Sequence, residues 1–171
     1  ANPDNPTGTY ITVSQFDTFM KKVPDRVLVI LDEAYFEYAC SVSDYPDSMV
    51  YRYDNVITLR TFSKIYGLAG LRIGYGFAHK SLIANLMKVK LPFEPSSVSQ
   101  EAALLALEDK DHIQKSIQVN LIEKERLINV LNKIGLNYIP SIANFITIIF
   151  KNRDDVINCS NYLLANGIII R

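Results

Sequence analysis

Residues 60–75 read Arg-Thr-Phe-Ser-Lys-Ile-Tyr-Gly-Leu-Ala-Gly-Leu-Arg-Ile-Gly-Tyr, and this stretch decides the fold. It joins two apolar runs, Val56–Leu59 and Ile73–Ala78, that are typical of strands. Upstream, Val27–Leu31 is aliphatic without alternation, which is typical of a parallel strand buried on both faces. Because each run ends in polar residues, the sequence predicts an α/β sheet, mostly parallel and flanked by helices, with a site at the carboxyl ends of its strands.

The rest of the chain has the apolar spacing of helices, with two further strands. Helices are predicted over Ser14–Lys22, Ser99–Leu107, His112–Lys133 and Asp154–Asn166, and strands over Phe145–Phe150 and from Ile168 onward. The character of the sequence changes after Pro92–Pro95, so we place a domain boundary near residue 110. Residues 1–109 are expected to form part of a large α/β domain, and residues 110–171 part of a smaller α+β domain.

Composition excludes several classes of protein. Of the 171 residues 49% are apolar, which is ample for a packed core and excludes a disordered chain. With 18 basic and 18 acidic residues, there is no electrostatic reason to expect nucleic acid or an anionic membrane as partner. No apolar run approaches the ~20 residues that span a bilayer. The polar, turn-forming start, Ala1–Pro6, is unlike a signal peptide.

The cysteines and histidines suggest neither a disulfide framework nor a metal site. Cys40 and Cys159 lie far apart and fit buried or incidental thiols of a reducing compartment. His79 and His112 stand beside no cysteine or carboxylate cluster, so we expect them at solvated surface positions and expect no metal. We therefore expect a cytoplasmic protein.

Three residues at chain breaks have side chains suited to cofactor chemistry. Lys64 follows a predicted strand and can form a Schiff base with a carbonyl, although a single lysine is more often an exposed surface residue. Asp32 ends a buried strand, where it either caps a following helix or pairs with a cation such as a protonated pyridine nitrogen. Tyr35 is close enough in sequence to reach the same ligand, or it packs in the core.

Arg72 lies eight residues beyond Lys64, across a loop that contains two glycines. A fixed guanidinium suits a phosphate, which it grips through two hydrogen bonds. Ser63 and Thr61 add hydroxyl groups beside it. The alternative for Arg72 is an ordinary surface ion pair, worth roughly 0–1 kcal/mol.

Taken together, these clusters resemble the fold-type I aminotransferases that depend on pyridoxal 5'-phosphate (PLP), and within them the histidinol-phosphate aminotransferases. The matching motifs, in order, are Asn2–Gly8, Asp32–Tyr38, Arg60–Tyr75, Ala143–Phe145 and Gly167–Arg171. The resemblance covers essentially the whole chain. Because the family's subunit is much longer, the chain is expected to be a fragment that lacks N-terminal and C-terminal parts and is inactive alone.

The resemblance implies roles for four residues around the cofactor ring. Lys64 would hold PLP as a Schiff base and act as general base. Asp32 would pair with the pyridine nitrogen, and Asn5 and Tyr35 would hydrogen-bond the phenolic oxygen. Lys64, Asp32 and Tyr35 would be the catalytic residues. The implied reaction is transamination of L-histidinol phosphate with 2-oxoglutarate, in histidine biosynthesis.

The resemblance also implies how anionic groups are bound. Ser63 and Arg72 would bind the cofactor phosphate, with Thr61 as a weaker candidate. Arg171 would face the anionic group of the substrate, with Asn5 also near the substrate. The family's Asn-Pro turn can contain a cis peptide, which makes Asn5–Pro6 a candidate for one. The full-length protein is expected to be a homodimer.

Two other functions fit the same residues. The first is another fold-type I enzyme, either an aromatic aminotransferase or a decarboxylase of a phosphorylated amino acid. The second is a non-catalytic PLP-sensing module of a transcription regulator, which would need a DNA-binding domain upstream. Glu33 and Glu37 are taken as structural residues in each case.

Overall fold

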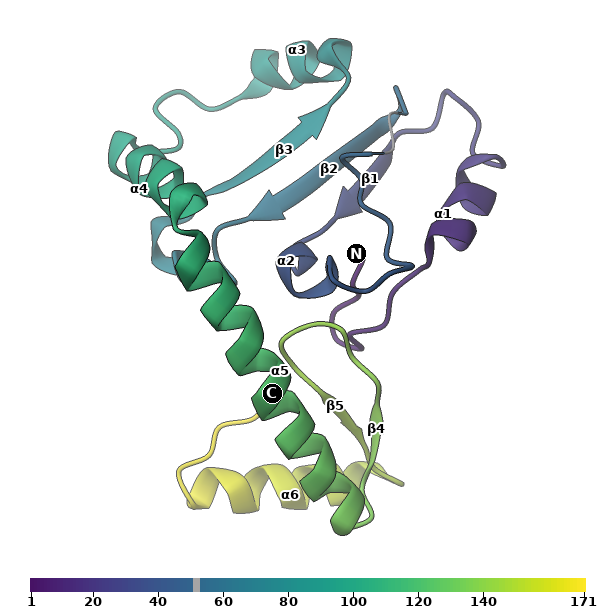
Figure 1. Ribbon diagram of the computed structural model, residues 1–171, viewed down its shortest axis with the longest axis vertical. Helices are drawn as coiled ribbons and strands as arrows, with labels where there is room; N and C mark the ends of the chain where they lie inside the picture. Colours follow the sequence, from purple (N-terminus) through teal and green to yellow (C-terminus); the bar gives the residue numbers. More distant parts are fainter. Residues whose placement is uncertain (51–52) are drawn as a thin grey trace.

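The computed structural model describes residues 1–50 and 53–171, in which a long helix runs from beside a three-stranded sheet to a two-stranded one (Figure 1). The first sheet has the order β1 (Val29–Asp32), β2 (Val56–Thr61), β3 (Gly74–Ala78). β1 runs parallel to β2, whereas β3 is antiparallel to it. The α/β class is confirmed, but the sheet is mixed rather than mostly parallel. The chain returns from β2 to β3 without a long crossover helix, so the two strands pair antiparallel.

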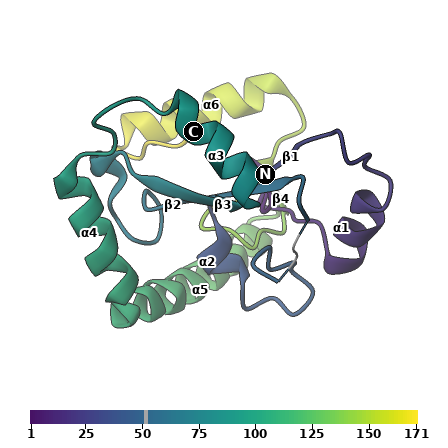
Figure 2. The ribbon, with the colours of Figure 1, turned by 90° about the horizontal axis from the view of Figure 1, so that it is seen from above.

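The described residues form six α-helices and one 3-10 helix. They are α1 (Val13–Met20), α2 (Phe36–Ala39), the 3-10 helix η1 (Ala69–Leu71), α3 (Lys80–Val89), α4 (Ser97–Glu108), α5 (Lys110–Lys133) and α6 (Arg153–Ala165). Figure 2 shows α3 on one side of the three-stranded sheet and α2, α4 and α5 on the other. The four helices expected from apolar spacing are present, whereas α2, η1 and α3 were not expected. The domain boundary predicted near residue 110 coincides with the break between α4 and α5 and stays a prediction.

The second sheet pairs β4 (Asn137–Ile139) with β5 (Thr147–Ile149) in antiparallel register. The strand predicted over Phe145–Phe150 is thus present in shortened form. The strand predicted from Ile168 is wrong: among the described residues it has no neighbour to pair with, and Ile169 is 85% exposed. In the part of the chain that the structure describes, no helix is long and apolar enough to cross a membrane.

One core cluster holds α1 against the first sheet. Phe16 and Met20 of α1 pack on Leu31 of β1 and Val56 of β2. The expectation that β1 is buried on both faces is wrong, because Leu31 is 6% exposed but Ile30 is 61% exposed. α1 covers only the face that carries Leu31, so β1 alternates like a half-buried strand.

Candidate active site

Lys64 lies in the segment between β2 and β3, and both ends of this segment are held in place by the core. Phe62 and Ile73 belong to a second core cluster with Ala103 of α4. The Phe62 N–H donates to the Ile73 carbonyl at 3.2 Å, and the Leu68 N–H donates back to the Phe62 carbonyl at 2.9 Å. Both ends of the loop that carries Lys64 are therefore fixed by core packing and backbone hydrogen bonds.

Three of the predicted site residues lie together, although they come from distant parts of the sequence. Asn5 Nδ2 donates to the Tyr35 hydroxyl at 2.9 Å. Lys64 Nζ lies 5.0 Å from the centre of the Tyr35 ring, and Tyr35 is buried. The grouping of Asn5, Tyr35 and Lys64 is thus a property of the fold, while the roles assigned to these residues stay predictions.

Asp32 ends β1 with its side chain exposed. Its Oδ1 accepts a hydrogen bond from the Ala34 N–H at 3.0 Å, which closes a local turn. The alternative that Asp32 caps a helix is wrong, because the N-cap residue of α2 is Tyr35. Parallel pairing places Asp32 opposite Leu59, so the carboxylate stands at the strand end that leads to Lys64.

The candidate phosphate ligands Ser63 and Arg72 flank the backbone hydrogen bond between Phe62 and Ile73. The Ser63 N–H donates to Thr61 Oγ1 at 3.1 Å. Arg72 has a left-handed backbone with φ of 49°, is exposed, and donates from Nη1 to the Ala69 carbonyl at 2.8 Å. Among the described residues Arg72 belongs to no ion pair, so the surface ion pair weighed for it is not formed.

Arg171 is not brought to this group by any described contact. It is exposed at the end of the chain, and none of the hydrogen bonds or ion pairs of residues 1–50 and 53–171 connects it with Asn5 or Lys64. The cis peptide proposed at Asn5–Pro6 is also wrong: the cis bonds precede Pro3 and Pro95.

Behind the site lies a buried ion pair that the sequence did not assign to function. Arg60 donates from Nε to Glu33 Oε2 at 2.9 Å, and Nη2 lies 2.8 Å from the same oxygen. The Glu33 side chain is 0% exposed and that of Arg60 is 8% exposed. The guanidinium carbon of Arg60 lies 3.3 Å from the centre of the Phe36 ring. The pair therefore ties the turn after Asp32 to the strand that leads to Lys64.

Burial also acts on the protonation of this cluster. Desolvation raises the pKa of Glu33, and the nearby Arg60 charge only partly opposes it. Burial likewise raises the pKa of Glu37, whose Oε1 is buried without a hydrogen-bond partner among the described residues. For Arg60, burial lowers the pKa, but the charge and hydrogen bond of Glu33 together with those of Tyr75 outweigh it, and the pKa is raised.

The structure adds residues that sequence reasoning missed. The Phe145 ring packs edge-on against Tyr35, with ring centres 5.2 Å apart and an interplanar angle of 81°. His112 is exposed as expected, yet its Nε2 lies 2.9 Å from the carbonyl oxygen of Ile65, the residue after Lys64. The Ala143–Phe145 motif could have indicated that Phe145 lies near the site. Nothing in the sequence around His112 indicates its contact with the residue after Lys64.

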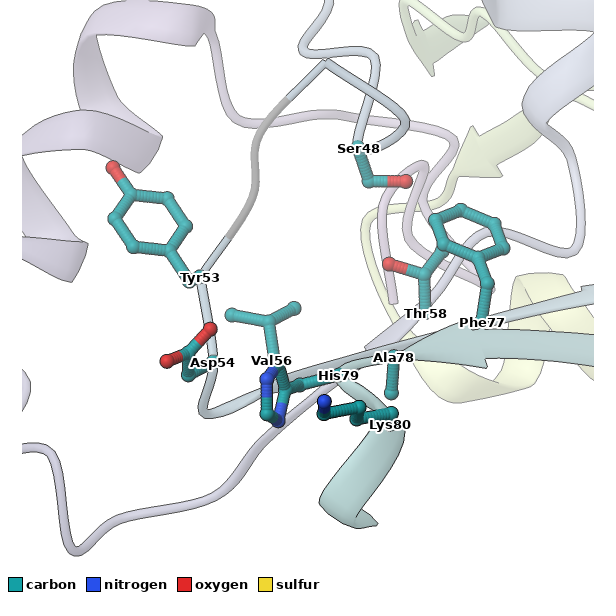
Figure 3. Close-up of a pocket in the computed structure, with 9 residues that line it drawn as sticks. All are labelled: Ser48, Tyr53, Asp54, Val56, Thr58, Phe77, Ala78, His79 and Lys80. Carbon is teal, nitrogen blue, oxygen red and sulfur yellow. The ribbon is translucent and has the colours of Figure 1, made fainter. Parts of the chain in front are cut away.

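A separate pocket of about 320 Å³ lies at the opposite end of β2 and β3 from Lys64. Figure 3 shows Ser48, Thr58 and Phe77 on one side of it and His79 with Lys80 on another. None of the predicted site residues lines it. The site is therefore identified by its side chains and not by the shape of this pocket.

Comparison with known sequences supports a specific family. The family described as "Aminotransferase class I and II" matches residues 1–171. A histidinol-phosphate aminotransferase of Halalkalibacterium halodurans is 47% identical over 99% of this chain and 46% of its own length. The chain thus spans about half the length of the relatives it matches.

Solved structures show the same fold. A histidinol-phosphate aminotransferase from Sinorhizobium meliloti, solved in complex with pyridoxal-5'-phosphate, superimposes with a TM-score of 0.90 at 32% identity, covering 99% of this chain and 47% of that one. L-threonine-O-3-phosphate decarboxylase from Porphyromonas gingivalis superimposes with a TM-score of 0.83 at 22% identity, covering 99% of this chain and 52% of that one, which shows the fold alone.

Proposed function

The chain belongs to the aminotransferase class I and II family, and from this premise we propose that it is part of an enzyme that transfers amino groups with PLP as cofactor. The observation that carries the proposal is the grouping of Asn5, Tyr35 and Lys64 beside the end of β2. These residues come from separate motifs, and each has a chemical property that the cofactor requires.

The donor set fits PLP. Because the Tyr35 hydroxyl accepts from Asn5 Nδ2, its own proton is free to donate to the phenolic oxygen of the cofactor. Asp32 offers a carboxylate to the pyridine nitrogen. Ser63 and Arg72 offer a hydroxyl and a guanidinium to the phosphate, where a cation and neutral donors are both favourable.

When bound, PLP supplies a carbonyl carbon that takes the amino group of the donor and a ring that accepts electrons from its α-carbon. Lys64 would hold the cofactor through Nζ, and its amine would then serve as the general base that takes the α-proton of the donor and delivers it to the former carbonyl carbon of the cofactor. Asp32 favours the protonated pyridine ring, which makes the ring a better electron acceptor. Tyr35, whose hydroxyl is held by Asn5, would donate to the phenolic oxygen of the cofactor.

The proposed substrates are L-histidinol phosphate and 2-oxoglutarate. Relatives named histidinol-phosphate aminotransferases, at 42–47% identity over nearly the whole chain, favour this donor over a phosphorylated amino acid that is decarboxylated. Arg171 would bind the anionic end of the substrate. Because the chain is about half as long as those relatives, we propose that it works within a longer, homodimeric polypeptide and is inactive alone.

The test uses the full-length protein that contains this chain, with Lys64→Ala and the exposed Lys151→Ala as matched control. PLP should give the parent and the control a visible absorbance band that Lys64→Ala lacks, and turnover should fall by on the order of 10²–10⁴ in Lys64→Ala. Assays with histidinol phosphate, phenylalanine and threonine phosphate separate the alternatives. An absorbance band and turnover that survive in Lys64→Ala would exclude the role of Lys64.

A further inference from the structure

Lys124 of α5 is a half-buried lysine whose partners are backbone carbonyls. Its Nζ donates to the Ser141 carbonyl at 2.9 Å and lies 3.3 Å from the Ala143 carbonyl. None of the ion pairs among the described residues involves it. Burial lowers the pKa of Lys124. Such an amine is costly to desolvate, so its hydrogen bonds to this one loop must compensate.

The loop that Lys124 holds is also pressed against the N-terminal turn. The Ile142 N–H donates to the Gly8 carbonyl at 3.0 Å, and Thr147 Oγ1 donates to the Pro6 carbonyl. Gly8 has φ of +74°, and a Cβ there would overlap Ser141. The loop therefore lies between α5 on one side and the Asn5–Gly8 turn on the other.

Tyr35 is contacted both by Phe145, which follows the 141–143 loop, and by Asn5, which begins the N-terminal turn. Phe145, two residues beyond the Ala143 carbonyl, packs edge-on against the Tyr35 ring. Asn5, at the start of the turn, donates to the Tyr35 hydroxyl. A shift of the loop away from α5 would thus release the ring of Tyr35 and disturb the turn that carries Asn5.

We propose that Lys124 is a positioning residue: by holding the 141–143 carbonyls it keeps Phe145 against Tyr35, and so keeps the Tyr35 hydroxyl aimed at the cofactor. The inference rests on the proposed function, because it assigns Tyr35 to the cofactor. It connects α5, which carries none of the predicted site residues, to the chemistry at Lys64.

The experiment compares Lys124→Met, Lys124→Arg and the exposed Lys115→Met of the same helix, all in the full-length protein. Lys124→Met keeps an unbranched side chain, one atom shorter than that of lysine, but has no donor. It should raise the Kd for PLP by roughly tenfold, as expected when a charged hydrogen-bond donor is lost. The absorbance maximum of the bound cofactor should shift, because the Tyr35 hydroxyl moves relative to the ring. Lys124→Arg should restore both quantities, and Lys115→Met should change neither.

Two further measurements separate positioning from loss of stability. Amide hydrogen exchange of residues 142–145 should be faster in Lys124→Met than in the parent. In a protein that already carries Phe145→Ala, adding Lys124→Met should no longer change the Kd for PLP. If Lys124→Met does not fold, Lys124→Gln takes its place: its side chain is neutral and shorter, so it loses the charged donor and should raise the Kd for PLP in the same direction. If the parent binds PLP and Lys124→Met has the same Kd and absorbance maximum as the parent, the inference is overturned. A parent that binds no PLP would instead overturn the proposed function, while the amide exchange would still show whether Lys124 holds the loop.

Discussion

The sheet region, residues 1–78, and the helical region, residues 110–171, are built differently. The sheet region buries its ion pair Glu33–Arg60, with side chains 0% and 8% exposed. The helical region leaves its ion pair Glu123–Arg126 in solvent, with side chains 58% and 76% exposed. Among the described residues beyond position 110, Leu131 and Ala143 are the buried hydrophobic ones. The sheet region therefore has a buried charged pair at its centre, whereas the helical region buries few hydrophobic residues and contacts the turn at Gly8 through the Ile142 N–H.

The largest expected effect is from breaking the buried pair. Glu33→Ala leaves the Arg60 guanidinium buried without its main partner, which costs about 3–5 kcal/mol of unfolding free energy. Urea denaturation of the full-length protein measures this loss. A loss below about 1 kcal/mol, the size of an average substitution, would show that the sheet region does not depend on this pair.

The contact between the two regions is tested by Gly8→Ala. A Cβ at this position overlaps Ser141, and φ of +74° disfavours alanine, so unfolding free energy should fall by about 1–3 kcal/mol. The matched control is Gly70→Ala, where a Cβ meets no atom within 4 Å. Equal stability of the two variants in urea denaturation would argue against a tight contact between the regions.

A pH series tests the buried charge of the sheet region. Burial raises the pKa of Glu37 above its ordinary value of 4.5. A carboxyl group of this kind holds its proton more tightly in the folded state, so its stabilising contribution is present below pH 4.5 and is lost as the pH rises through the folded-state pKa. Glu37→Gln should therefore show a smaller fall in stability over that window than the parent. The exposed Glu123→Gln is the control and should follow the same dependence of stability on pH as the parent. If Glu37→Gln also follows the parent, the prediction is contradicted.

The smallest effect is expected in the helical region. Glu123→Ala removes an exposed pair three residues apart on α5, which contributes about 0.2–0.5 kcal/mol. Urea denaturation beside Glu33→Ala gives a direct comparison of the two pairs. A loss as large as that of Glu33→Ala would break the contrast between the regions.

Several elements of the fold could be predicted from local patterns. Apolar spacing located α1, α4, α5 and α6, because a helix face repeats within a few residues. Strand direction could not be read in this way, since the antiparallel pairing of β3 depends on the short return from β2. The strand expected from Ile168 also could not be judged from the local pattern, because an apolar run forms a strand only when a neighbouring strand pairs with it.

For the candidate site, the sequence by itself determined which residue types are available for chemistry: residue type and motif predict roles for Lys64, Asp32, Tyr35 and Arg72. Only the tertiary structure decided what stands beside them. Asn5 meets Tyr35 across 30 positions, and Lys124 meets Ser141 across 17. Such contacts depend on how separate elements pack, because side chains this far apart along the chain meet only when the chain folds and loses conformational entropy. The support that surrounds the predicted site residues is therefore a property of the fold.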